Sequence, residues 1–281
     1  MHTGVLIFAT DYSIRMDELA VELEQRGFES LFNPEHTHIP ASRESAWPGG
    51  SELPLEYSHT YDPFVSLAWA AAATKTLKVG TGICLLPQRD TIVTAKLVAS
   101  LDRMSNGRFI FGIGGGWNKE EMRNHGVVYK NRFKRMEEQV LAMKGLWTEE
   151  TYGYQGKHVQ FEPSWCHPKP VQSPHPPVIL GGESDYTLQR VVNYCNGWLP
   201  RARHGFDAAA NLTRLRGFAD AAGRDMSSLP VSIFGAQPDA DVLKGYADAG
   251  ITRAILPLPS KSREEILPIL DRYTKLLSQV S

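Results

Sequence analysis

The chain has 281 residues, 42% hydrophobic and 22% charged, which is the composition of an ordinary globular protein. Thirty basic and 31 acidic residues leave a formal net charge of −1 with no basic block, which argues against nucleic acid or an anionic membrane as a partner. No signal-peptide pattern or long apolar stretch is present, and three unevenly spaced cysteines indicate free thiols, so we expect a cytoplasmic protein without a transmembrane helix.

Eight apolar segments alternate with helix-like segments along the chain. The segments that predict buried strands are residues 4–9, 30–33, 77–83, 108–113, 177–180, 197–199, 229–234 and 252–256. The segments that predict helices are residues 16–26, 62–74, 91–104, 132–147, 184–195, 206–222, 239–249 and 263–277, the last with Pro268 inside it.

Two long stretches without periodicity interrupt this alternation. Residues 37–60 are rich in Pro, Gly, Ser and Glu and predict a long loop, which in a compact domain is usually functional or disordered. Residues 149–176 hold several prolines and predict a second irregular stretch.

The alternation predicts a single (β/α)₈ barrel over residues 1–281, with long insertions after the second strand and before the fifth. A doubly wound dinucleotide-binding fold is the alternative. Its G-x-G-x-x-G fingerprint does not fit, because the third glycine position after Gly112 and Gly114 falls on Trp117. No strand ending in an acid follows about 20 residues later, so we favour the barrel.

Active sites of such barrels lie at the carboxyl ends of the strands. That rule selects short segments after the second, third, fourth and fifth strands. They are Glu35-His36, Thr81-Gly82-Ile83, Gly114-Gly115-Gly116-Trp117-Asn118 and Gly181-Gly182-Glu183-Ser184.

The turn Gly181–Ser184 stands directly before a helix, with Ser184 as the N-cap and Thr187 in the first turn. Free backbone N–H groups and the positive end of the helix dipole make such a turn an anion site. The alternative is a tight turn with an ordinary serine cap, but phosphate sites recur at this face of barrels.

His36 follows a strand and precedes a long loop, which favours a role in proton transfer, although an isolated histidine is commonly a surface or structural residue. His36-Thr37-His38 also has the H-x-H form of a metal-binding pair. The eighth strand ends in Ile255-Leu256-Pro257 and offers no ligand, so a dinuclear barrel hydrolase fits poorly and we predict no metal.

Several motifs resemble the luciferase-like monooxygenase superfamily, and most closely its branch of coenzyme F420-dependent oxidoreductases. The matching segments are residues 80–102 (GTGICLLPQRDTIVTAKLVASLD), 105–127 (SNGRFIFGIGGGWNKEEMRNHGV), 167–182 (HPKPVQSPHPPVILGG) and 196–198 (NGW). The resemblance covers about the first 200 residues and concerns the family, not one protein.

The resemblance implies roles for particular residues. Glu35 and His36 match an acid–histidine pair beside the flavin ring and the substrate, and Gly82-Ile83, after Thr81, matches a cis peptide against which the ring rests. The segment Gly114–Asn118 would line the pocket, with the glycines as a floor that leaves room for a flat ring beside Trp117. Gly181, Gly182, Glu183 and Ser184 resemble the family's phosphate-binding turn, near Thr187, and residues 149–176 resemble its insertion, a candidate lid.

One position departs from luciferase itself. An arginine in the loop after the fourth strand of luciferase grips the flavin phosphate, whereas this chain has Gly115 there. That difference favours another branch of the family. It leaves the phosphate to backbone N–H groups and a cation that the sequence does not identify.

The resemblance therefore implies hydride transfer between coenzyme F420 and a small organic substrate, with a proton exchanged at His36. An FMN-dependent monooxygenase that uses O₂ and a partner reductase is the alternative; a non-catalytic flavin-binding protein and a metal-dependent hydrolase rank lower. A homodimer is expected from the resemblance alone.

Overall fold

Eight parallel strands form the centre of the molecule in the computed structural model, which describes residues 1–50, 52–202 and 206–280. Residue 51 of the expected loop therefore lies outside the described residues. The strands are β1 (His2–Leu6), β2 (Ser30–Asn33), β3 (Lys78–Thr81), β4 (Phe109–Ile113), β7 (Val178–Gly181), β8 (Gly197–Leu199), β9 (Ser232–Phe234) and β10 (Arg253–Pro257).

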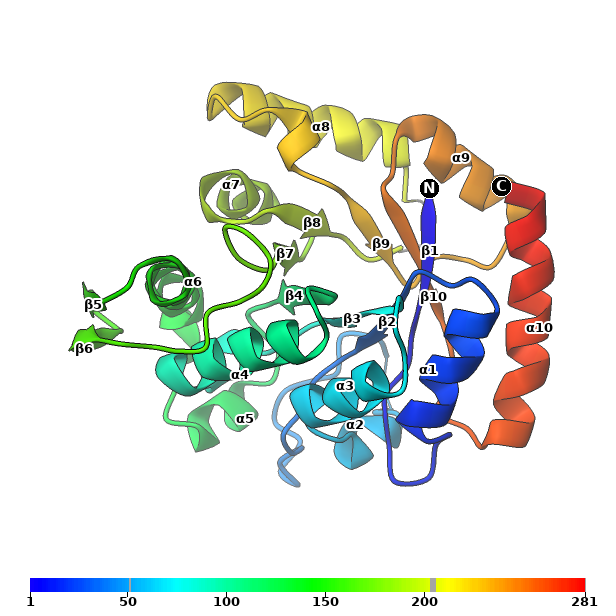
Figure 1. Cartoon of the computed structure of the whole chain (residues 1–281), viewed down its shortest axis with the longest axis horizontal. Helices are drawn as coiled ribbons and strands as arrows, with labels where there is room; N and C mark the ends of the chain where they lie inside the picture. Colours follow the sequence, from blue (N-terminus) through cyan, green and yellow to red (C-terminus); the bar gives the residue numbers. More distant parts are fainter. Residues whose placement is uncertain (51, 203–205, 281) are drawn as a thin grey trace.

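The strands follow the order β8-β7-β4-β3-β2-β1-β10-β9, and every neighbouring pair is parallel. The two end strands meet through the parallel bridges Trp198–Val231 and Arg201–Phe234, and the Phe234 amide donates to the Pro200 carbonyl at 2.8 Å. The sheet thus closes into the ring seen in Figure 1. The predicted (β/α)₈ barrel is confirmed.

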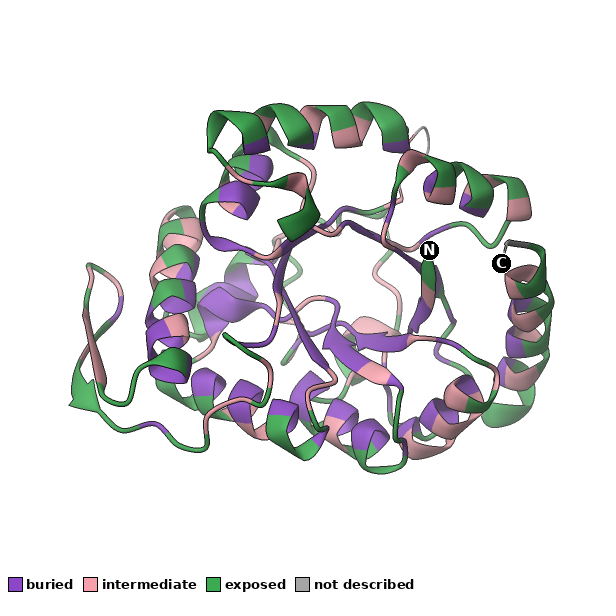
Figure 2. Ribbon diagram, turned by 45° about the horizontal axis from the view of Figure 1, so that its top comes forward, coloured by how far each residue is buried: buried purple, intermediate pink, exposed green. Residues whose placement is uncertain are grey.

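Helices surround the barrel and turn their apolar sides toward it (Figure 2). The long ones are α1 (Met16–Gln25), α3 (Pro63–Ala72), α4 (Thr91–Met104), α6 (Arg132–Thr148), α7 (Asp185–Tyr194), α8 (Ala208–Ala221), α9 (Ala240–Ala249) and α10 (Arg263–Val280). Among the described residues, none of the helices combines the length and apolarity needed to cross a bilayer.

Local sequence explains where these helices begin and end. Asp62 caps α3 by accepting hydrogen bonds from the amides of Phe64 and Val65, with Pro63 in the first helical position. Gly250 ends α9 at a φ of 94°, a left-handed conformation that glycine adopts without strain.

Two apolar clusters hold the barrel together. The larger one fills the space between strands and helices. The smaller one fills the barrel interior and consists of Leu6, Phe32, Ile110, Ile179, Leu199 and Ile255, with Ile83 and Phe234 packed against it. Because these side chains fill the barrel interior, a ligand can enter only at the end of the barrel formed by the carboxyl ends of the strands.

Residues 149–176 are more regular than their sequence indicates. They contain an antiparallel hairpin of β5 (Tyr152–Gln155) and β6 (Gln160–Ser164), so the expectation of an entirely irregular stretch was wrong. The hairpin projects from the barrel beside α6 in Figure 1. Its turn is held by Glu138, which accepts hydrogen bonds from the amides of His158 and Val159.

Two short helices were also not predicted. The loop 37–60 contains α2 (Glu56–His59), and the segment after β4 contains α5 (Lys119–Asn124). Each is too short to show a helical period in the sequence. The second one carries a residue of the candidate site.

A largely buried ion pair stabilises the end of the barrel at which the strands begin. Glu29, just before β2, accepts hydrogen bonds from Arg253 Nε and Nη2, both at 2.7 Å, and also pairs with Lys78 at 2.9 Å. Burial opposes ionisation, but the bonds from Arg253 outweigh it and lower the pKa of Glu29 to about 2.

This pair predicts a loss of stability in acid. A carboxyl whose pKa falls from 4.5 to about 2 on folding stabilises the fold above pH 4.5, and this contribution disappears as the pH falls toward 2. Glu29→Gln should lower the free energy of unfolding at pH 7 by about 3 kcal/mol. Its difference from the wild type should vanish toward pH 2, as urea unfolding at a series of pH values can measure. A constant difference over that range would contradict the assignment, and Glu44→Gln, in an exposed pair, is the control.

Candidate active site

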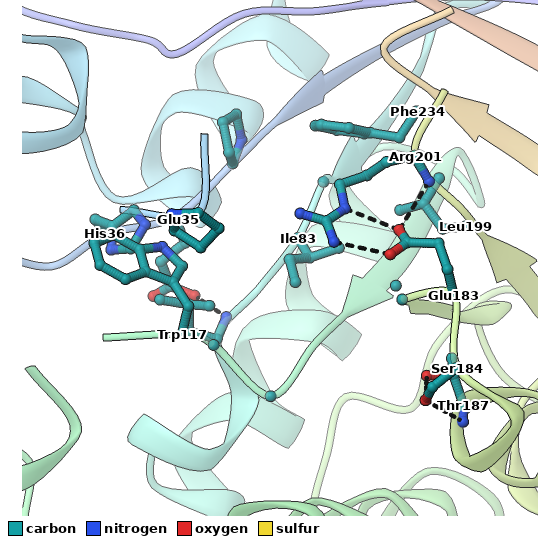
Figure 3. Close-up of a pocket in the computed structure, with 18 of the residues that line it drawn as sticks. Glu35, His36, Ile83, Trp117, Glu183, Ser184, Thr187, Leu199, Arg201 and Phe234 are labelled. Carbon is teal, nitrogen blue, oxygen red and sulfur yellow. Dashed lines mark hydrogen bonds and ion pairs between the residues drawn. The ribbon is translucent and has the colours of Figure 1, made fainter. Parts of the chain in front are cut away.

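A cavity of about 460 Å³ opens at the carboxyl ends of the barrel strands (Figure 3). It brings together twelve of the residues selected from the sequence: Glu35, His36, Gly82, Ile83, Gly115, Gly116, Trp117, Gly181, Gly182, Glu183, Ser184 and Thr187. Three other selected residues, Thr81, Gly114 and Asn118, do not line it.

The Gly82–Ile83 peptide bond at the end of β3 is cis, as the resemblance implied. In Figure 3 the Ile83 side chain stands between the group of Glu35, His36 and Trp117 and the group of Glu183 and Arg201. Thr81 lies one layer lower and is fully buried, where its hydroxyl donates to the Gly112 carbonyl at 2.6 Å. Thr81 therefore ties β3 to β4 below the cavity.

The glycine run after β4 makes room for protein side chains. A Cβ at Gly114 would lie 1.9 Å from Ile83 Cδ1, and a Cβ at Gly115 would lie 2.6 Å from the Phe133 ring. Gly116 has a φ of 70°, and its Cβ would meet the Met122 methyl at 2.7 Å. The expectation of a glycine floor kept clear of side chains was therefore wrong at these positions, although Gly115 and Gly116 still expose their backbone to the cavity.

Glu35 is buried, and both of its carboxylate oxygens accept hydrogen bonds. One carboxylate oxygen accepts from the Leu85 amide at 2.7 Å, and the other accepts from Arg89 Nε at 2.7 Å. Arg89 also pairs with Asp62, the cap of α3. Glu35 thus joins the ends of β2 and β3 and holds its neighbour His36 in place.

His36 is 7% exposed and lies on the cavity wall after β2. Its Nδ1 is 2.8 Å from Oε2 of Glu121, a fully buried carboxylate on α5. An ionised carboxylate only accepts hydrogen bonds, so Nδ1 carries a hydrogen and Nε2 remains for a ligand. Asn118 caps α5 by accepting a hydrogen bond from the Glu121 amide at 3.0 Å. This bond fixes the position of the Glu121 backbone in the first turn of α5.

Glu121 is the main site residue that the sequence reasoning missed. A signal was present, because a capping asparagine followed three residues later by glutamate is typical of a helix start. That signal marks a helix but does not reveal that the side chain reaches a histidine 85 residues earlier.

Aromatic side chains surround His36. The Tyr57 ring lies 5.2 Å from the His36 ring, and the Trp117 ring meets it edge-on at 5.7 Å. Phe8 packs on Tyr57 at 4.6 Å and also lines the cavity. Burial raises the pKa of the Tyr57 hydroxyl, so this wall stays uncharged at neutral pH.

The loop 37–60 contributes Pro48 and Tyr57 to the cavity wall. Trp47 contacts Tyr57 at 5.7 Å but is not a wall residue, and His59 pairs with Asp11 at 2.9 Å away from the cavity. Ser45 fastens the loop to α5 through its amide, which donates to a Glu120 carboxylate oxygen at 2.8 Å.

The turn Gly181–Ser184 has the expected N-cap geometry, while its role in anion binding stays a prediction. Ser184 caps α7 by accepting from the Thr187 amide at 3.2 Å, and the two hydroxyls lie 3.0 Å apart. Gly182 has a φ of 124°, and a Cβ there would lie 2.9 Å from Thr187 Oγ1. Trp198 of the NGW motif donates its indole N–H to the Gly182 carbonyl at 2.7 Å. The helix N-terminus is therefore held facing the cavity.

Glu183 and Arg201 form an ion pair at the mouth, opposite His36 (Figure 3). Arg201 donates to both carboxylate oxygens at 2.8 Å, and this pairing raises its pKa. Glu183 is therefore neutralised and does not repel an anion in the turn. Arg201 was not singled out, because it stands after the very short strand β8 and belongs to no motif.

Two arginines pack against Phe133, a residue of the cavity wall, although neither lines the cavity itself. The guanidinium carbons of Arg132 on α6 and Arg190 on α7 lie 4.3 and 4.1 Å from the centre of the Phe133 ring, which lines the cavity. Arg190 is one helical turn beyond Thr187. Within the ranges that the structure describes, neither arginine pairs with a carboxylate.

Arg132 donates from Nη1 to the Tyr129 carbonyl at 3.0 Å and stacks on the Tyr129 ring at 3.7 Å, but no carboxylate among the described residues faces it. Its Nε is buried without a hydrogen-bond partner among the described residues. Burial lowers the pKa of Arg132, and the nearby Arg190 charge adds to the effect. An anion between the ring and the helix would relieve both costs.

The H-x-H motif does not assemble a metal site. His36 faces Glu121, whereas His38 Nδ1 lies 2.9 Å from the Thr37 hydroxyl. In the part of the chain that is described, no group of three or more His, Cys, Asp or Glu side chains is suited to holding a metal ion.

Comparisons with known proteins place the chain in a family. Residues 10–237 match the family described as luciferase-like monooxygenase. An uncharacterized protein of Mycobacterium tuberculosis (strain H37Rv), Rv0953c, is 36% identical over 283 aligned positions, covering 99% of each chain. The FMNH(2)-dependent dimethylsulfone monooxygenase of Pseudomonas putida is 35% identical over 116 positions, which cover 40% of this chain and 32% of that protein.

Solved structures share the architecture. An F420-dependent secondary alcohol dehydrogenase, in complex with an F420–acetone adduct, superposes over the whole of both chains with a TM-score of 0.76 at 18% identity. At that identity the likeness concerns the fold alone.

Proposed function

Because the chain belongs to the luciferase-like monooxygenase family, whose oxidoreductases use a flavin or a deazaflavin, we propose that it transfers hydride between coenzyme F420 and a small organic substrate. One observation carries the proposal. A single cavity contains the buried His36, the apolar side chains of Ile83 and Trp117, and the turn Gly181–Ser184 at the start of α7. An apolar wall, a buried acid–base group and a helix N-terminus suit a cofactor with a planar ring and a phosphate.

The residues present fit such a cofactor. Ile83 and Trp117 would contact its ring, and the first turn of α7 would receive its phosphate. Gly182 leaves room for that group, because any larger residue would collide with Thr187. Arg132 and Arg190 supply the cation that the sequence did not identify, and the unpartnered Nε of Arg132 is the observation that favours them.

When bound, the deazaflavin supplies hydride chemistry, since it carries carbon where a flavin has N5 and reacts poorly with O₂. The protein then has to move one proton. We assign that proton to His36 Nε2, because Glu121 holds Nδ1 and leaves Nε2 for a ligand in the cavity. Tyr57 and Trp117 restrict water around the ring.

An FMN-dependent monooxygenase is the second candidate. The 35% identity with the FMNH(2)-dependent dimethylsulfone monooxygenase over 116 positions favours it. Such an enzyme would also need a separate reductase to supply reduced FMN. The choice of F420 rests on the motifs of residues 80–127 and on Gly115, which stands where luciferase has its phosphate-binding arginine.

Titration of the purified protein with each cofactor tests the proposal. We expect F420 to bind tightly and to add its absorption band at about 420 nm, with much weaker binding of FMN, whose band is at about 450 nm. Tight binding of FMN without binding of F420 would overturn the first candidate and support the second. Binding of neither would overturn both.

We also propose that the protein is a homodimer, as its family resemblance implies. Val65 and Trp69 on α3 and Ile92 and Val93 on α4 are exposed apolar side chains on neighbouring helices. Side chains of this kind are commonly covered in an interface.

A further inference from the structure

The motif His36-Thr37-His38 is not explained by a metal site, yet its polar atoms are connected. We infer that Glu121, Thr37 and His125 form a proton relay between the buried His36 and solvent. The inference rests on the proposed role of His36 in proton exchange with a substrate. It adds the route by which that proton reaches or leaves the bulk water.

The first step of the relay joins two buried groups. His36 Nδ1 and Glu121 Oε2 are 2.8 Å apart, and the side chains are 6% and 0% exposed. An imidazole can accept a proton at Nε2 and release one from Nδ1, so the proton that leaves is not the one that arrived. Glu121 is the base positioned to take it.

The second step brings the proton to the surface. The other Glu121 oxygen, Oε1, accepts from the Thr37 amide at 3.2 Å and lies 3.5 Å from the Thr37 hydroxyl. Thr37 is exposed, and its hydroxyl can donate and accept at the same time. This 3.5 Å contact is the longest in the relay. A small rotation of the Thr37 side chain must shorten it before a proton can pass.

The last step ends at two imidazoles near the surface, the exposed His125 and the half-buried His38. The Thr37 hydroxyl lies 2.7 Å from His125 Nε2 and 2.9 Å from His38 Nδ1. His38 Nε2 in turn lies 2.8 Å from the Asn124 amide nitrogen. Burial lowers the pKa of His125, and the His38 charge adds to this, so His125 is neutral near pH 7 and able to accept a proton.

The relay would be needed when the active site is filled, because the cavity then offers no water to His36. The Nε2 side of His36 faces the cavity, which bound cofactor and substrate would fill. Protons could then pass only through Nδ1. The relay moves one proton and no electrons: Nε2 gains a proton, and Nδ1 passes one to Glu121 Oε2. Rotation of the carboxyl group then turns this O–H toward the Thr37 oxygen, which takes the proton while the Thr37 hydrogen moves to His125.

Exchange of the His36 Nδ1–H hydrogen with water tests the relay without cofactor or substrate. In protein labelled with ¹⁵N-histidine, the exchange rate is measured by NMR saturation transfer at one pH, with His36→Asn to assign the signal. Thr37→Val should slow the exchange about tenfold or more, a modest share of the about 10²–10⁴-fold that positioned proton transfer contributes. Thr37→Ser, which keeps the hydroxyl, should retain the wild-type rate.

Glu121→Gln is the second variant, because an amide accepts the Nδ1 hydrogen bond but does not take up its proton. It should slow the exchange as well. Unchanged exchange in Thr37→Val would overturn the route through Thr37, and unchanged exchange in both variants would overturn the relay. If neither F420 nor FMN binds while exchange depends on Thr37, the proposed function fails and the relay stands. If a cofactor binds and exchange ignores Thr37, the reverse holds.

Discussion

Replacing His36 with alanine is expected to lower turnover about 10²–10⁴-fold, the range that a positioned acid–base group contributes. The affinity for the cofactor should stay within a few fold, because His36 lies on the wall with Tyr57 and Trp117, away from the turn at Ser184 (Figure 3). Removal of the ring leaves the Glu121 carboxylate without its partner and the proton without an acceptor. The measurement is the rate of absorbance change of the cofactor with a substrate found by screening small organic compounds.

His59→Ala is the matched control for this variant. His59 belongs to the same loop, pairs with Asp11 and does not line the cavity, so its removal should leave turnover near the wild-type value. Unchanged turnover in His36→Ala would remove His36 from the proposed chemistry. Loss of cofactor affinity equal to the loss of turnover would instead place His36 in binding.

Several strand ends could be predicted from the sequence because the apolar run stops at glycine or a polar residue, whereas β1 ends at Leu6, inside the apolar run 4–9. Phe109–Ile113 is buried at every position and stops at Gly114, and Val178–Gly181 stops at the turn before Ser184. In a closed parallel barrel all such ends meet at one face, so the approximate site follows from the fold. Twelve selected residues therefore share one cavity.

The rest depends on contacts that no local pattern encodes. The hairpin escaped prediction because Gln160–Ser164 is mostly exposed and contains Pro163, so neither alternation nor β-propensity marks it. Glu121 and Arg201 enter the site only because loops after β4 and β8 return to it. The glycines after β4 were predicted to leave room for a ligand. In the structure, the side chains of Ile83, Phe133 and Met122 occupy the positions next to these glycines.

The two arginines beside Phe133 lead to the second large prediction. The double replacement Arg132→Met with Arg190→Met should weaken binding of the phosphorylated cofactor about 10²–10⁴-fold, since each of the two charge-assisted contacts contributes about 1.5–3 kcal/mol. Binding of the same cofactor without its phosphate should change only a few fold. Riboflavin is that form for FMN, and the bare deazaflavin chromophore is that form for F420. Fluorescence titration of both forms isolates the contribution of the phosphate.

Lys134→Met is the matched control, because it removes one positive charge from an exposed position on the same helix as Arg132. A long-range effect of net charge would weaken binding in this variant too, and high salt would screen it. A contact effect would spare Lys134→Met and persist in salt. If the phosphate contributes as much in the double variant as in the wild type, the N–H groups of α7 and the hydroxyls of Ser184 and Thr187 hold it alone. The unpartnered Nε of Arg132 would then have no role in binding.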